Sequence, residues 1–315
     1  MLGFILRRVL NLVPLLLILT VIVFLLVEIA PGDPAAIIAG PDASPDAIAA
    51  IRGELGLDRP LHERYLAYVG NAIQGDLGTS FVTSEPVTDV IVRRLPRTVG
   101  LVALALLISV IVSIPLGLIS ALRASSIADR TVTVVSSVLI AVPPFVIAAV
   151  LVRYFALGGF ASLPAVGYRP MSDGVGTWLT FAILPAVTIA TISLAELTRT
   201  MRGSVIDAME EDYIRTARAK GLGHVSIVGK HAFKNAAVPY VTILGLQVGR
   251  IVGAAVIVES IFNVTGFGQL GVEAVLERDL PTLQGVVLVS GLIVLAVNLL
   301  VDLSYGYLNP RTRTR

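Results

Sequence analysis

Long apolar runs dominate the pattern of positions along this chain of 315 residues. Six runs are long enough to cross a bilayer as helices, which takes about 20 apolar residues. They lie near residues 9–30, 98–122, 131–155, 178–198, 239–262 and 284–306. The runs lack the two-residue alternation of barrel strands and exceed the length of one such strand. The pattern therefore predicts an all-α polytopic membrane protein with six transmembrane helices.

A polar segment, residues 31–97, separates the first two runs and carries helix signals of its own. Ser44-Pro45 combines a capping residue with proline at the first helical position, and apolar residues follow at helical spacing. Residues 60–74 repeat this pattern, and Pro86 begins a third instance. We expect a small helical segment here, which either covers helix ends or docks a partner.

Residues 199–239 form a charged, amphipathic stretch between two apolar runs. Ser204 and Asp207 resemble a capping box, which predicts a helix start. Gly221 can take the left-handed conformation that ends a helix, and a second short helix is expected before Pro239. The apolar positions of the first helix are predicted to share one face. They are Ile206, Met209, Tyr213 and Ala217.

Lysine and arginine are distributed unequally between the two sides of the membrane. The two short loops on one side hold only Arg169 and Arg278, whereas most other Lys and Arg residues fall on the opposite side. The positive-inside rule then places both termini and residues 199–239 in the cytoplasm and residues 31–97 outside. The first run is too long for a typical signal-peptide core, and no A-x-A site follows it, so we expect a retained helix.

Composition supports the membrane assignment and removes several other classes. The chain is 55% hydrophobic with a net charge of +2, so nothing suggests a nucleic-acid partner. It has no cysteine, which excludes disulfides, thiol catalysis and cysteine-based metal sites. The three histidines are scattered over both sides of the membrane, and no metal site is expected.

Two short patterns resemble nucleotide-binding motifs, but the residues around them do not fit such a site. Residues 266–271 fit G-x-G-x-x-G but follow a membrane span instead of the strand of a βαβ unit. Gly229-Lys230 resembles the end of a P-loop, but His224 and His231 occupy positions where glycine and serine or threonine belong. We therefore expect no ATP site of this type in the chain and an energy source in another subunit.

Arg250 is the main candidate for chemistry inside the membrane. It lies near the middle of the fifth run, where a charge is costly and marks a functional position by default. Gln247 and Glu259 are further candidates for a translocation pathway or for intramembrane pairing. Glu196, Glu259 and Asp302 are the candidate partners of the arginine. Glycines spaced four apart in the same run, at 245, 249 and 253, fit either packing within the chain or a dimer seam.

Several motifs resemble the binding-protein-dependent ABC importer permeases, and most closely their dipeptide/oligopeptide/nickel branch. Arg-Thr-Ala-Arg-Ala-Lys-Gly at 215–221, followed by Lys-His-Ala-Phe-Lys-Asn-Ala-Ala-Val-Pro at 230–239, resembles the cytoplasmic coupling loop of that branch. The general family pattern of Glu-Ala-Ala, three residues and Gly is matched only at Ala217 and Gly221. Further matching motifs are PGDP at 31–34, GDLGTS at 75–80, VPPF at 142–145, ESIF at 259–262, GFG at 266–268, DLSY at 302–305 and NPR at 309–311.

The resemblance implies the MetI-like fold of type I ABC importer permeases, with a helical extracytoplasmic insertion between the first two membrane helices. It divides the chain into an N-terminal transmembrane helix (1–30), an extracytoplasmic segment (31–97) and a permease core (98–315) with a coupling loop (199–239). It implies coupling through a set of residues in that loop. They are Tyr213, Arg215, Thr216, Ala217, Lys220, Gly221, Leu222, His231 and Asn235.

The same resemblance implies a non-enzymatic permease subunit in a bacterial plasma (inner) membrane, which binds no cofactor itself. The implied partners are a second homologous permease, two ATPase subunits that bind ATP and Mg, an extracytoplasmic binding protein, the lipid bilayer and a di- or oligopeptide substrate. Nickel chelates or another small solute are alternative cargoes. A secondary transporter is disfavoured because we see no carboxylate cluster deep in the spans, and an intramembrane enzyme because no histidine lies in a predicted span.

Overall fold

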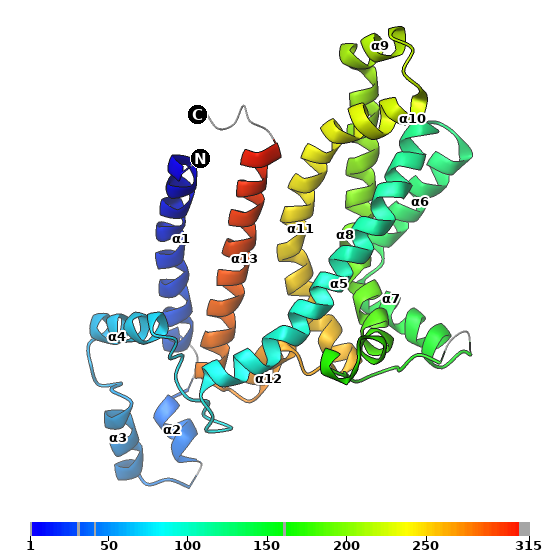
Figure 1. Ribbon diagram of the computed structural model, residues 1–315. Helices are drawn as coiled ribbons and strands as arrows, with labels where there is room; N and C mark the ends of the chain where they lie inside the picture. Colours follow the sequence, from blue (N-terminus) through cyan, green and yellow to red (C-terminus); the bar gives the residue numbers. More distant parts are fainter. Residues whose placement is uncertain (1, 30–31, 41, 160–161, 309–315) are drawn as a thin grey trace. The chain divides into compact units, whose positions relative to one another are not determined.

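The structure is a computed structural model that describes residues 2–29, 32–40, 42–159 and 162–308. Within these ranges the regular elements are helical, with one isolated β-bridge between Thr79 and Pro86. The helices, labelled in Figure 1, are α1 (Leu2–Ile29), α2 (Pro34–Ala39), α3 (Pro45–Glu54), α4 (Leu61–Ile73), α5 (Val87–Leu122), α6 (Ile127–Ala141), α7 (Pro144–Leu151), α8 (Val175–Glu210), α9 (Asp212–Ala219), α10 (His224–Ser226), α11 (Phe233–Phe262), α12 (Phe267–Leu276) and α13 (Leu280–Leu308). Two π-helical turns, η1 (Val152–Ala156) and η3 (Ile227–Ala232), and one 3₁₀ turn, η2 (Met171–Asp173), complete the set.

The helices group into two compact units. The first unit comprises Met1–Leu6, Arg97–Thr265 and Ala296–Arg315, and the second comprises Arg7–Pro96 and Gly266–Leu295. The first unit contains the charged 199–239 stretch and the Arg250 region, so it positions both candidate sites.

Five helices in the described part of the chain are long and apolar enough to cross a membrane, and a bent pair of helices raises the number to six if it counts as one span. The five are Leu10–Ile29, Val87–Leu122, Val175–Glu210, His224–Phe262 and Leu280–Val301. The all-helical membrane fold expected from the sequence is thereby confirmed.

The third expected span, residues 131–155, is not one straight helix. It divides into α6 and α7, which meet at an angle of 106° (Figure 1). Val142 and Pro143 both have extended backbone conformations between the two helices. A residue that precedes proline is driven out of the α region, and Pro143-Pro144 imposes this twice in succession. Two consecutive prolines therefore break the span.

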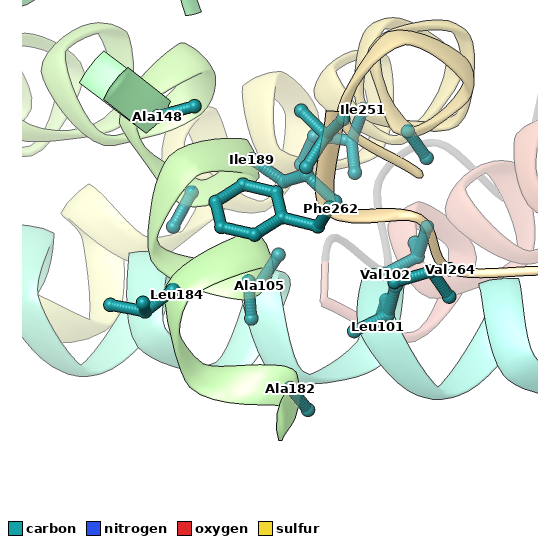
Figure 2. Packing of buried hydrophobic residues seen from close by; sticks show 14 of the residues in the cluster. Leu101, Val102, Ala105, Ala148, Ala182, Leu184, Ile189, Ile251, Phe262 and Val264 are labelled. Atoms are coloured by element: carbon teal, nitrogen blue, oxygen red, sulfur yellow. The ribbon is translucent and has the colours of Figure 1, made fainter. Parts of the chain in front are cut away.

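Two hydrophobic clusters of the first unit are named outer and inner, after the sides of the membrane that the sequence predicts for them. The outer cluster holds α5, α7, α8 and α11 together. Figure 2 shows Phe262 of α11 among Ile189 of α8 and Leu101 and Ala105 of α5. These four side chains are completely buried. The cluster joins early residues of α8 to late residues of α11, and small residues such as Ala105 let the helices approach closely.

An inner hydrophobic cluster joins the other ends of the same two helices. Leu197, Met201 and Val205 of α8 pack against Ala236 and Tyr240 of α11. Late α8 meets early α11 here, and early α8 meets late α11 in the outer cluster. The two helices are therefore antiparallel.

Hydroxyl groups supplement this apolar packing. Ser109 of α5 hydrogen-bonds Ser193 of α8 at 2.9 Å, and Ser113 of α5 hydrogen-bonds the Tyr240 hydroxyl at 2.7 Å. Hydrogen bonds between side chains of neighbouring membrane helices each stabilise association by about 0.6 kcal/mol on average. α5 is thus bonded to both members of the α8–α11 pair.

Close helix approach depends on glycine at two positions of the first unit. A Cβ at Gly117 of α5 would lie 2.6 Å from the Met201 Cβ and 2.9 Å from the Thr198 carbonyl oxygen of α8. A Cβ at Gly245 of α11 would lie 2.2 Å from a Val301 methyl of α13. Gly245 therefore packs within the chain, one of the two interpretations left open by the glycine spacing.

Two of the helices expected between residues 31 and 97 are present in the second unit. α3 begins after Ser44, whose side chain accepts the Ala47 N–H at 3.3 Å, and α4 ends just before Gly75. The third expected helix is not separate, because it forms the first turns of α5. The apolar residues Val87 and Ile91 are buried in this unit and favour helix continuation into the span.

One short outer helix was not expected. α2 follows Asp33, which caps it by accepting the Ala35 N–H at 3.1 Å. Asp33 also pairs with Arg52 of α3 at 2.5 Å, and this hydrogen bond lowers the pKa of the Asp33 carboxyl. Of the preceding PGDP motif, Pro31 lies outside the described residues.

We predict that Gly117→Ala lowers the free energy of unfolding by about 1–3 kcal/mol, the usual cost of overpacking. The Thr198 carbonyl oxygen belongs to helix backbone and cannot move aside cheaply. Gly203→Ala on α8 is the matched control, since a Cβ there meets no atom within 4 Å. Unfolding in detergent micelles measures both variants, and an equal loss of stability in the two would contradict the close contact.

Candidate functional site

The charged stretch at residues 199–239 does not begin with the new helix at Ser204 that the sequence predicts. α8 continues without a break through Ser204 to Glu210, so the capping box at Ser204 and Asp207 is not a helix start. Met201, Val205 and Ala208 are buried at helical spacing on both sides of Ser204. This packing stabilises continuation of the helix and overrides the local capping signal.

The chain turns at Glu211. Its backbone is extended, with φ −68° and ψ 149°, and α9 begins at the next residue. Asp212 occupies the first turn of α9, where a negative charge complements the helix dipole. We call residues 211–232 the coupling segment, after the role that the sequence predicts for this stretch; it comprises α9, α10 and η3.

α9 packs against α8 and η3 through one apolar stripe. Ile214 is completely buried and Ala217 is 5% exposed, and both pack with Ala208, Ile227 and Ala232. The expected common face of Ile206, Met209, Tyr213 and Ala217 is only partly correct. Met209 packs against this cluster with Ala217, but the extended residue at 211 changes the helical register and removes Tyr213 from that face. Tyr213 points outward and is 37% exposed.

Gly221 ends α9 as expected. Its φ is +77°, in the left-handed region. The Gly221 N–H donates to the Arg218 carbonyl at 2.9 Å, and the Leu222 N–H donates to the Ala217 carbonyl at 3.2 Å. These two bonds define a Schellman motif. A Cβ at Gly221 would meet no atom within 4 Å, so the demand for glycine is conformational and not steric crowding by neighbours.

The expected second helix is not separate from the fifth span. α10 and η3 run directly into α11, and Pro239 lies inside α11 instead of opening it. Val228 and Ala232 are buried, whereas Val225 is 86% exposed. His231 lies in η3 and is half-buried, and its carbonyl accepts the Asn235 side-chain amide at 3.2 Å.

Apart from His231 and Asn235, the predicted coupling residues separate into two groups. Ala217 faces its own chain. An outward-facing group is exposed and leaves the segment accessible to another molecule. It contains Tyr213, Arg215, Thr216, Lys220, Gly221 and Leu222.

A partly buried ion pair at the base of the coupling segment was not predicted from the sequence. Arg202 of α8 binds both carboxylate oxygens of Asp129 on α6, at 2.6 and 2.8 Å. Asp129 also accepts the Ser125 N–H at 2.9 Å and the Ser120 hydroxyl. The carboxylate is 7% exposed, and its bidentate geometry fixes the direction in which α8 leaves the inner cluster. Ser126-x-x-Asp129, an N-cap signal before an apolar run, could have indicated this site.

A second polar group lies between the two hydrophobic clusters. Glu196 of α8 accepts hydrogen bonds from Gln247 at 2.6 Å and from Arg250 at 2.7 Å, both on α11. We call these three residues the intramembrane polar cluster. On α8 it lies between Ile189 of the outer cluster and Leu197 of the inner cluster. It is therefore surrounded by apolar layers above and below.

Glu259, another acidic candidate, lies apart from this cluster. Glu259 is completely buried near the end of α11 and accepts a hydrogen bond from Thr98. The side chain of Asp302 lies outside the described residues, as does the NPR motif at 309–311. No group of three His, Cys, Asp or Glu residues that could hold a metal ion occurs in the described part of the chain.

The geometry defines an integral membrane protein with an amphipathic helical hairpin at one end of its α8–α11 pair. Residues 113–314 match the family described as binding-protein-dependent transport system inner membrane component, and residues 1–102 match the N-terminal family of the same system.

Full-length relatives agree with this match. The chain is 40% identical over 311 residues to a probable peptide ABC transporter permease of Sinorhizobium fredii, covering 98% of this chain and 99% of the relative. It is also 40% identical to a putative peptide transport system permease of Brucella abortus, over 99% of both chains. It is 38% identical to the glutathione transport system permease GsiC of Escherichia coli, again over 99% of both chains.

The chain belongs to the binding-protein-dependent ABC importer permease family and is a multi-pass inner-membrane protein. Members of this family are permease subunits and work with ATPase and substrate-binding partners.

We predict that Arg202→Leu lowers the free energy of unfolding by about 2 kcal/mol. Breaking a fully buried ion pair costs roughly 3–5 kcal/mol, and the Arg202 side chain is 33% exposed. Arg199→Leu, at an exposed position on the same helix, should change stability by less than about 0.5 kcal/mol. The double variant Arg202→Leu with Asp129→Asn should lose less than the sum of the two single variants. Additive losses in micelle unfolding would contradict the pair.

Proposed function

We propose that this chain is one of two homologous permease subunits of a peptide importer. The observation that carries the proposal is the coupling segment, an exposed hairpin built rigidly onto the α8–α11 pair. The names of its relatives support a peptide-like cargo, since they are described as peptide and glutathione permeases. Two ATPase subunits that bind ATP and Mg would energise import, and an extracytoplasmic binding protein would deliver the peptide.

The segment is suited to transmit movement because each of its attachments is stiff. The Schellman motif fixes the exit of α9, Ile214 and Ala217 fix its position against α8 and η3, and Arg202 with Asp129 fixes the base of α8. An ATPase that binds the exposed side of α9 and moves on ATP binding would carry α8 and α11 with it. Rigid-body movement of this kind produces alternating access in transporters.

Arg250 and Gln247 are proposed to line the path of the cargo. An arginine 64% exposed at this depth is too costly against lipid, so its exposed side requires a polar surrounding. Glu259 is not included in this proposal because it is completely buried in the outer cluster.

We propose that both termini and the coupling segment are cytoplasmic and that the 31–97 segment is outside. The chain has no cysteine, so single substitutions suffice for labelling without a modified background. Gly70→Cys should react with a membrane-impermeant maleimide added to intact spheroplasts, and Gly223→Cys should react only after permeabilisation. Labelling of position 223 from the outside would refute this orientation.

Gly221→Val tests the coupling role. The left-handed conformation costs a residue with a Cβ about 1–2 kcal/mol, and a β-branched residue more. We expect normal membrane insertion but at least about tenfold weaker ATPase binding, or ATP hydrolysis without uptake. Gly223→Val is the matched control because Gly223 has φ −67° and open surroundings.

Ala217→Asp and Ala219→Asp form a second pair of variants in the same helix. Ala217 is buried, so a carboxylate there should detach α9 and abolish coupling, whereas Ala219 is exposed and should tolerate the change. Co-purification of the ATPases and uptake of trialanine into proteoliposomes measure both pairs. Wild-type binding and uptake by both Gly221→Val and Ala217→Asp would exclude this segment as the coupling element.

A further inference from the structure

The intramembrane polar cluster has unused hydrogen-bonding capacity. Both of its hydrogen bonds end on one atom, Glu196 Oε2, which receives Gln247 Nε2 and Arg250 Nη1. In the described part of the chain no residue bonds the second carboxylate oxygen of Glu196 or the remaining N–H groups of Arg250. An ion pair that served only to close two helices together would be expected to use more of its donors and acceptors internally.

Gln247 has the same incomplete bonding from a buried position. Its residue is 1% exposed, and its Oε1 has no partner among the described residues. The amide orientation is determined, because rotating it would place Oε1 against the Glu196 carboxylate. A buried acceptor without a donor is unfavourable, so the described part of the chain does not by itself satisfy the cluster fully.

The exposed sides of the pair lie deep in the membrane-spanning region. Arg250 is 64% exposed and Glu196 is 39% exposed. Arg250 precedes the end of α11 at Phe262 by 12 residues, about 18 Å along the helix, which compares with about 30 Å for the hydrocarbon core. Lipid chains cannot solvate either charge, so a polar occupant must face them.

Opposite charges 2.7 Å apart select a particular kind of occupant. A solute with a single charge is attracted by one member of the pair and repelled by the other. A solute that carries a carboxylate and N–H donors on one backbone can satisfy both at once, the carboxylate on the guanidinium and the N–H groups on the free Glu196 oxygen. A peptide with free ends has this chemistry.

We propose that the intramembrane polar cluster is a substrate-binding site that recognises the charged ends and main chain of a peptide during translocation. Arg250 binds the substrate carboxylate, Glu196 accepts the N–H groups of its amino-terminal ammonium, and Gln247 is a positioning residue that orients Glu196. This inference rests on the proposed peptide-import function and adds a site within the permease to it.

The test uses the complete transporter in proteoliposomes, with ATP and saturating binding protein. Uptake of trialanine, trialanine amide and N-acetyl-trialanine is compared for wild type, Arg250→Gln and Glu196→Gln. Dividing each variant rate by the wild-type rate for the same peptide removes the preference of the binding protein. Arg250→Gln should lower trialanine uptake about tenfold and trialanine amide uptake less than twofold. Glu196→Gln should lower trialanine uptake about tenfold and N-acetyl-trialanine uptake less than twofold.

A second measurement uses trialanine alone and does not depend on whether the binding protein accepts the blocked peptides. Leu246 lies one helical turn before Arg250 and is 61% exposed, and the chain has no native cysteine. Trialanine should slow maleimide labelling of Leu246→Cys at least threefold in the otherwise wild-type transporter. It should not slow labelling when Arg250→Gln is also present.

The outcomes separate this inference from the proposed function. Equal losses for all three peptides, or recovery of uptake by the charge exchange Glu196→Arg with Arg250→Glu, would show a structural pair and overturn the binding site while peptide import stands. Unchanged uptake in both variants would overturn it as well. Failure of the wild-type transporter to import any of the peptides would overturn the peptide-import proposal and this inference together.

Discussion

The antiparallel packing of α8 against α11 is the interaction on which the rest of the first unit depends. The outer cluster joins early α8 to late α11 around Phe262, and the inner cluster joins late α8 to early α11 around Met201 and Tyr240. α5 is bonded to both helices through Ser109 and Ser113. The hydrophobic effect contributes little between helices in lipid, so close packing and these hydrogen bonds must hold the pair.

The coupling segment follows directly from this packing. α8 extends past its apolar region because Val205 and Ala208 continue the buried stripe, and the chain then reverses at Glu211 and Gly221 to enter α11. A hairpin that joins two packed helices cannot move far without them. The Arg202–Asp129 pair adds α6 to the same body, so a force on α9 reaches three helices.

The intramembrane polar cluster destabilises the packing of α8 against α11. Glu196, Gln247 and Arg250 lie between two apolar clusters, where charge and unpaired amide oxygen are unfavourable. Their presence at that depth is understandable if the chain needs a polar surface along its cargo route. The apolar layers above and below keep the two helices packed while the cluster remains incompletely bonded.

The amino-acid sequence by itself determined the membrane class, the helical nature of the spans and the need for glycine at 221. Each of these depends on local properties: run length, hydropathy and the left-handed conformation of one residue. The family resemblance read from the sequence motifs agrees with the family match and with a relative that covers 98% of this chain.

Only the tertiary structure decided which local signals prevail. The capping box at Ser204 is overridden by burial of Met201, Val205 and Ala208, whereas Pro143-Pro144 does break the third span. Ile214 is buried in place of Tyr213 because the extended residue Glu211 shifts the register of α9. The sequence offered Arg250 three carboxylates as partners, and the antiparallel register of α8 and α11 brought it to Glu196. Such choices depend on contacts between residues far apart in the chain, which a local pattern does not contain.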